Sequence, residues 1–92
     1  MLTPAFDRQL AAQTADQLRK KATAAANIGN WQEALEIGRR LVEQQPREGT
    51  VFLVRLHDGR ARSLLRANEK EEACRQFAIA AEVLETAAIE AL

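Results

Sequence analysis

The chain has 92 residues, 47% of them hydrophobic, and its 13 basic residues balance 13 acidic ones. This length suits a single domain, and the composition is that of a globular protein rather than a disordered segment. A formal net charge of zero disfavours general binding to nucleic acid or to anionic membranes, because both depend on an excess of Lys and Arg. The sequence has no long apolar run, and Asp7 and Arg8 interrupt its start. We therefore expect neither a membrane span nor a signal peptide, and a cytoplasmic location.

Helix-forming residues dominate the chain, since Ala, Leu, Glu, Arg and Lys make up 52 of its 92 residues. This composition predicts an all-α protein. The first helix is expected to begin at Thr3 and Pro4, a capping residue followed by one suited to the first helical position. It should end at Ile28 and Gly29, where Gly can adopt a left-handed conformation. Its apolar or small residues recur at helical spacing: Phe6, Leu10, Thr14, Leu18, Ala22 and Ala25.

A second helix is predicted directly after this corner. Asn30 and Glu33 have the spacing of a capping box, in which each side chain bonds the other's backbone amide. Pro46 should end this helix near Gln44 or Gln45, because the residue before a proline disfavours helical backbone angles.

Two more helices are expected in the second half of the chain. We predict a loop over residues 47–49, with Thr50 as the cap of a third helix that runs to about Arg66. Asn68 either adopts a left-handed conformation or caps a fourth helix, which begins near Glu69 and continues to the C-terminus. The expected apolar stripe of that helix is Ala73, Phe77, Ala80, Ala81, Leu84 and Ala88.

Residues 29–46 and 68–85 form an internal repeat with an offset of 39 residues. Each copy has a turn residue and then an Ala, followed by apolar or small residues four and seven positions later. These positions are Ala34, Gly38 and Leu41 in the first copy and Ala73, Phe77 and Ala80 in the second. Upstream, Leu18, Ala22 and Ala25 match His57, Ala61 and Leu64.

On these residues the chain resembles the tetratricopeptide repeat (TPR) family. The run Gly29-Asn30-Trp31, with Ala34 after it and Pro46 closing the copy, is similar to the family motif. The chain departs from the family in four places. Gly38 stands where an aromatic residue is usual, His57 occupies the large position, Glu85 replaces the second closing Pro, and the offset exceeds the 34-residue period.

The resemblance implies two antiparallel helix pairs, four helices in all, stacked as a short TPR-like solenoid with extended N- and C-terminal helices. We expect one domain spanning residues 1–92, with repeats at about 15–46 and 50–85. The alternative is an unrelated four-helix bundle whose corners happen to be alike.

The residues offer little for catalysis. Cys74 and His57 are the single residues of their types, whereas a zinc site needs several such ligands. The glycines are isolated, so no phosphate-binding loop is present. We expect Cys74 to be buried, His57 to be packed or half-exposed on its helix, and the protein to be a non-enzyme without metal or cofactor.

Binding is better supported. The resemblance implies a groove lined by the first helix of each pair. Arg55, Arg62 and Arg66 share one helical stripe, and the forked donors of Arg suit carboxylates. An acidic peptide or a C-terminal carboxylate is therefore a candidate ligand; alternatively, these arginines only pair with nearby glutamates. The remaining groove positions are Asp16, Arg19, Thr23, Asn27 and Asp58.

A second candidate surface consists of apolar residues in the terminal helices. They would pack on each other, on a second copy or on a partner protein. These residues are Phe6, Leu10, Leu84, Ala88, Ile89 and Leu92. The favoured function is a non-catalytic protein–protein interaction module, adaptor or chaperone-like, that binds a peptide or a partner helix. The alternatives are a homo-oligomeric structural subunit of a larger complex, or a nucleic-acid regulator that uses the arginine stripe.

Overall fold

The computed structural model describes the backbone of residues 4–90 and the side chains of residues 14–90. All regular structure in this part of the chain is α-helical, which confirms the predicted fold class. The helices are α1 (Pro4–Asn27), α2 (Trp31–Gln44), α3 (Pro46–Arg66) and α4 (Lys70–Glu90). Of the residues expected to form a terminal interface, Leu92 lies outside the described residues, as do the side chains of Phe6 and Leu10.

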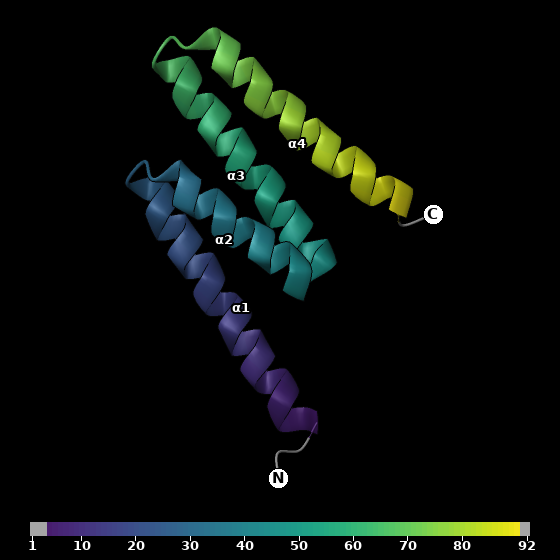
Figure 1. Cartoon of the computed structure of the whole chain (residues 1–92). Helices are drawn as coiled ribbons and strands as arrows, with labels where there is room; N and C mark the ends of the chain where they lie inside the picture. The colour runs from purple at the N-terminus through teal and green to yellow at the C-terminus, as the bar shows by residue number, and fades with distance from the viewer. Residues whose placement is uncertain (1–3, 91–92) are drawn as a thin grey trace.

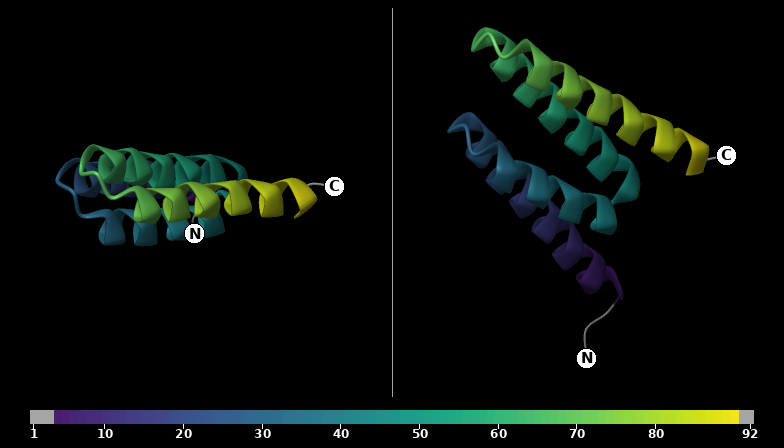
Figure 2. Two further views of the ribbon diagram at one scale, coloured as in Figure 1. Left: turned by 90° about the horizontal axis from the view of Figure 1, so that it is seen from above. Right: turned by 45° about the horizontal axis from the view of Figure 1, so that its top comes forward.

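The four helices form a thin layer in which the chain runs back and forth (Figures 1 and 2). The molecule measures 55 × 35 × 12 Å along its principal axes. Helix α2 packs on α1, α3 on α2, and α4 on α3, so the second and third helices have a neighbour on each side. The α1–α2 and α3–α4 corners lie at the same edge of the layer, and the N-terminal half of α1 extends past the end of α2 (Figure 1).

The α1–α2 and α3–α4 corners have the same backbone geometry at positions 39 residues apart. Gly29 has a φ of 82° and Asn68 a φ of 64°, both in the left-handed region. In each corner the following residue donates its N–H over 2.8 Å to the carbonyl five residues back, which closes the helix in a Schellman motif. These bonds join Asn30 to Ala25 and Glu69 to Leu64. Asn68 therefore takes the left-handed role rather than that of a cap.

The start of α2 differs from the predicted capping box. The Asn30 side chain makes no capping hydrogen bond to the backbone. Its Nδ2 instead donates to Glu33 Oε2 over 2.8 Å, so the two side chains bond each other and not the amides. The prediction of reciprocal backbone capping is wrong, although α2 begins at Trp31, directly after the expected cap.

The α2–α3 corner is much tighter than expected. Gln45 is the single residue between these helices, so the prediction of a loop over residues 47–49 is wrong. Pro46 begins α3 because a proline at the first helical position loses only an amide that would have no intrahelical partner. Thr50, predicted to cap this helix, lies inside it, and its hydroxyl donates to the Pro46 carbonyl over 2.6 Å.

Gly49 allows this corner to close. A Cβ at this position would lie 2.5 Å from the Val42 nitrogen and 2.6 Å from the Leu41 carbonyl. The first turn of α3 thus touches the backbone of α2, and no larger residue fits without moving one of the two helices.

The core is small and rich in alanine. Ala22 and Ala34 are fully buried, and Leu41 is the largest side chain of which the same is true. Small side chains let the helix axes approach closely, and Leu53 and Leu56 of α3 fill the remaining space beside α2. The central cluster joins the first three helices through Ala22, Ala25, Ala34, Leu35, Ile37, Leu53 and Leu56.

Candidate functional site

The predicted arginine stripe is present on α3, but one of its members is already paired. Arg55, Arg62 and Arg66 are all exposed. The Arg62 Nε lies 2.8 Å from Asp58 Oδ2, one turn earlier. Within residues 14–90, Arg55 and Arg66 have no ion-pair partner. Two guanidinium groups of the stripe are thus available to a carboxylate ligand.

Arg19 of α1, expected to line the same groove, is part of an intramolecular network. Its Nη1 lies 2.9 Å from Asp16 Oδ1, and its Nη2 donates to the Gln45 side chain and lies 3.9 Å from Glu48 Oε2. Arg19 therefore ties α1 to the corner that begins α3. This contact spans 26 residues in sequence between Arg19 and Gln45, and sequence spacing gave no sign of it.

Thr23 and Asn27 of α1 are exposed, as a groove position requires. Among the described residues, no hydrogen bond connects either side chain to the arginines of α3. The structure therefore places the expected groove residues on the surface without joining them into one binding site.

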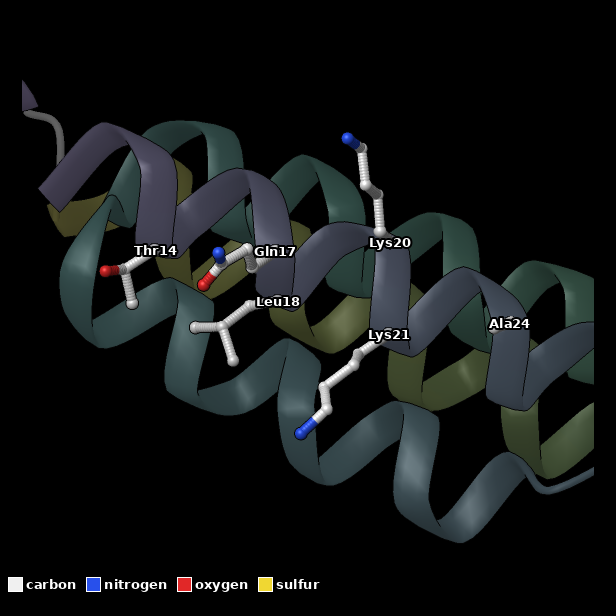
Figure 3. A pocket seen from close by; sticks show the side chains of 6 residues that line it. All are labelled: Thr14, Gln17, Leu18, Lys20, Lys21 and Ala24. Carbon is white, nitrogen blue, oxygen red and sulfur yellow. The ribbon is translucent and has the colours of Figure 1, made fainter. Parts of the chain in front are cut away.

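A shallow hollow lies on α1 and is lined by that helix alone (Figure 3). Lys20 and Lys21 point to different sides of it (Figure 3), so their ammonium groups do not converge on a common ligand. The hollow is lined by Thr14, Gln17, Leu18, Lys20, Lys21 and Ala24. We interpret it as the exposed outer face of the first helix.

His57 and Gln76 form a buried polar contact between α3 and α4. Each side chain is 5% exposed, and the His57 Nδ1 lies 2.9 Å from Gln76 Oε1. Gln76 Nε2 donates to Glu72 Oε1 over 3.3 Å, which leaves its oxygen as the acceptor. The hydrogen-bond network therefore assigns the imidazole hydrogen to Nδ1. His57 is packed, as predicted, and serves the interface rather than the surface.

Cys74 is exposed, so the prediction that it is buried is wrong. Its neighbour Ala73 is fully buried, because successive residues of a helix point about 100° apart and only one of them faces α3. The spacing of small residues in the sequence does not indicate which of these two neighbours faces α3.

An exposed apolar stripe runs along α4. Phe77 is 37% exposed and Leu84 is 49% exposed. The stripe predicted for the fourth helix is therefore divided, because Ala73 and Ala80 are buried whereas Ala81 and Ala88 are exposed with these two. We define the α4 stripe as Cys74, Phe77, Ala81, Leu84 and Ala88, all of them exposed.

The structure thus divides the expected terminal interface. Leu84 and Ala88 belong to the α4 stripe, whereas Ile89, 63% exposed, is on another side of the helix. Phe77 is the large exposed member that the sequence-based interface did not include. The sequence contained one signal: Phe77 lies seven residues before Leu84, about two helical turns, and therefore on the same side of the helix.

Within the described residues, no three His, Cys, Asp or Glu side chains are grouped so that they could bind a metal ion. The helices there also lack an apolar stretch long enough to cross a bilayer. Comparison of the chain with protein-family models, with curated proteins and with solved structures found no match. Function must therefore be argued from the surfaces of the molecule.

Proposed function

We propose that this protein is a non-catalytic protein–protein interaction module, adaptor or chaperone-like, that binds a helix of another protein. The α4 stripe carries the proposal. Phe77 and Leu84 expose large apolar groups on one side of a regular helix, in line with small residues that let a second helix approach. Contiguous exposed apolar surface of this kind marks interaction sites.

The likeness of the two helix pairs supports a TPR-like solenoid as the architecture of this module. Gly29 and Asn68 close their helices in the same way, and α2 and α4 both begin two residues after them. In a solenoid each unit covers its neighbour, and the last unit presents an uncovered face. The α4 stripe lies on the last helix of the second pair.

The buried side chain of His57 supports a non-catalytic role that needs no cofactor. Its bonding to Gln76 removes the sole imidazole of the sequence from solvent. The zero formal net charge argues for a protein ligand rather than nucleic acid or a lipid surface.

The arginine stripe is a second surface for the same function. Arg55 and Arg66 are exposed and unpaired among residues 14–90, so they could hold an acidic peptide. Arg62 and Arg19 already pair with Asp58 and Asp16. This pairing argues against one binding site formed by all the predicted groove residues, which are Arg19, Thr23, Asn27, Arg55, Arg62 and Arg66.

Site-specific crosslinking tests the proposal. A photo-crosslinking amino acid would replace Phe77 or Leu84, with Glu36, exposed on α2, as the control position. We expect one discrete protein adduct from positions 77 and 84 in cells, and none from position 36. Absence of an adduct at both stripe positions, or equal labelling from the control, would overturn the proposal.

The same stripe also permits the alternative of a homo-oligomeric structural subunit. In that case the adduct has the mass of two copies of this chain. Sedimentation would then show a dimer that dissociates when Phe77 is replaced by Ser.

A further inference from the structure

The residues beside the α4 stripe indicate which kind of helix binds it. We infer that the partner is an amphipathic helix of another protein, with an apolar coiled-coil seam edged by Lys or Arg. This inference rests on the proposed function and specifies its partner.

The α4 stripe has the spacing of a coiled-coil seam. Its five members follow one another at intervals of three, four, three and four residues, the seven-residue pattern that pairs two helices side by side. From Cys74 to Ala88 the seam extends about 21 Å at 1.5 Å per residue. A second stripe with the same spacing faces α3 through Ala73, Gln76 and Ala80. Helix α4 thus has two faces suited to helix packing, and within the described chain it packs mainly on α3.

The first helix pair shows what covers the positions of α2 that are equivalent to the α4 stripe. Counting back 39 residues, Cys74 corresponds to Leu35, which is 3% exposed, and Phe77 corresponds to Gly38, which is buried. A Cβ on Gly38 would lie 2.9 Å from Leu56 and 3.1 Å from Leu53. A helix that presents large aliphatic side chains therefore occupies this face in the first pair, and the second pair has the same face open.

Head-to-tail stacking of a second copy does not supply such a helix. The positions of α1 that correspond to Leu53 and Leu56 are Thr14 and Gln17. Both line the hollow of α1 (Figure 3). At these two positions α1 offers a hydroxyl and an amide where α3 offers leucines, so α1 of another copy does not reproduce the cover that α3 gives to the first pair.

Two-fold pairing of α4 with its own copy is disfavoured by charge. Glu71 and Glu85 lie on the edge of the stripe, one residue after Lys70 and Leu84. If two copies of α4 pair antiparallel, this edge of one helix lies along the same edge of the other, which runs in the opposite direction. Glu71 of one copy then faces Glu85 of the other. If the copies pair in parallel, Lys70, which continues the α4 stripe four residues before Cys74, faces Lys70 of the other copy. Like charges brought together in either way oppose association.

The same edge suits a basic partner. Glu71 and Glu85 are exposed, and within residues 14–90 neither has an ion-pair partner. A helix with Lys or Arg at the matching edge positions would pair with both carboxylates while its apolar seam covers Phe77 and Leu84. Electrostatic complementarity of this kind selects partners.

Two synthetic 21-residue peptides test the inference. Both carry Leu at the two seam positions of each heptad; one has Lys at the edge positions and the other has Glu. Each peptide repels its own copies, which limits self-association. Binding would be measured by fluorescence anisotropy on the full chain. The variants are Glu71→Lys/Glu85→Lys, Phe77→Ser/Leu84→Ser, and the control Glu36→Lys/Glu43→Lys on exposed positions of α2.

We expect the Lys-edged peptide to bind about tenfold more tightly than the Glu-edged one. Glu71→Lys/Glu85→Lys should reverse this preference, the α2 control should keep it, and Phe77→Ser/Leu84→Ser should abolish both interactions. Circular dichroism would check that each variant stays helical.

Three results would overturn the inference. Equal, stripe-dependent binding of both peptides removes the basic partner but leaves the docking surface. Binding of neither peptide removes the inference, and crosslinking from positions 77 and 84 then decides the proposed function separately. A concentration-dependent dimer that Phe77→Ser/Leu84→Ser dissociates identifies a second copy as the occupant.

Discussion

Gly49 shows how one residue can set the distance between two helices. Its missing side chain lets the first turn of α3 lie against the backbone of Val42 and Leu41. The sequence suggested a flexible role in a loop, yet the residue is buried within a helix. Its function is to make room rather than to supply a turn.

We therefore expect Gly49→Ala to lower the free energy of unfolding by about 2–3 kcal/mol, since the new methyl meets backbone atoms that cannot move aside. Urea denaturation would measure this loss. Gly59→Ala in the same helix is the control. Its Cβ would lie 3.3 Å from the Trp31 ring, and the gain in helix propensity of about 1 kcal/mol offsets that contact. Similar losses for both variants would contradict this account of Gly49.

Asn68 provides a second prediction at this scale. It holds a φ of 64° at the α3–α4 corner, a conformation that glycine adopts without steric cost. Asn68→Gly should raise the free energy of unfolding by about 0.5–1 kcal/mol, as measured by chemical denaturation. Ala67→Gly, at a φ of −85°, should lower it by a similar amount. A loss of stability in Asn68→Gly would show that its side chain matters more than its backbone.

At the scale of elements, the α3–α4 interface combines small apolar residues with one buried polar pair. Ala61 of α3 and Ala73 of α4 are fully buried, and His57 bonds Gln76 across the interface. Gln76 in turn bonds Glu72, which lies 3.2 Å from Arg75. A satisfied polar network in an apolar interface favours one alignment of the two helices.

Replacing one member of the His57–Gln76 pair should lower the free energy of unfolding more than replacing both. His57→Leu leaves the Gln76 oxygen buried without a donor and should lower the free energy of unfolding by about 1–3 kcal/mol. Adding Gln76→Leu should restore much of that loss. A double-mutant cycle in urea would give the coupling energy. Strictly additive effects would mean that the hydrogen bond contributes nothing to the interface.

At the scale of the whole molecule, the helices pack in series. Helices α2 and α3 each pack extensively on two helices, whereas α1 packs mainly on α2 and α4 mainly on α3. The flat shape, 12 Å in its smallest dimension, leaves much apolar surface exposed, including the α4 stripe. A molecule of this shape gains stability when a further helix covers an open face.

Amide hydrogen exchange should reflect this order. We expect the slowest exchange in the middle of α2 and α3, and faster exchange in α1 and α4, because the outer helices can open without disrupting two interfaces. Mass spectrometry of exchanged peptides would measure it. Protection that is uniform across all four helices would contradict packing in series and indicate a single cooperative unit.

Local residue chemistry was enough to predict the all-helical fold and the positions of its corners. Gly29 ends α1 because of its backbone freedom, and Pro46 separates α2 from α3 because it disfavours helical angles in Gln45. These effects act within a few residues, so they can be read from the chain. The same rules misplaced Thr50, because a proline is compatible with both a loop and a first helical turn.

The candidate site depended on tertiary structure instead. Two stripes with the same spacing lie side by side on α4, and sequence periodicity cannot say which one α3 covers. The packing of His57 and Ala61 against Gln76 and Ala73 decides it, and so leaves Phe77 and Leu84 exposed. Arg19 likewise appeared available to a ligand until the fold brought Gln45 beside it. Contacts between residues far apart in the sequence are set by the arrangement of whole helices, which no local pattern specifies.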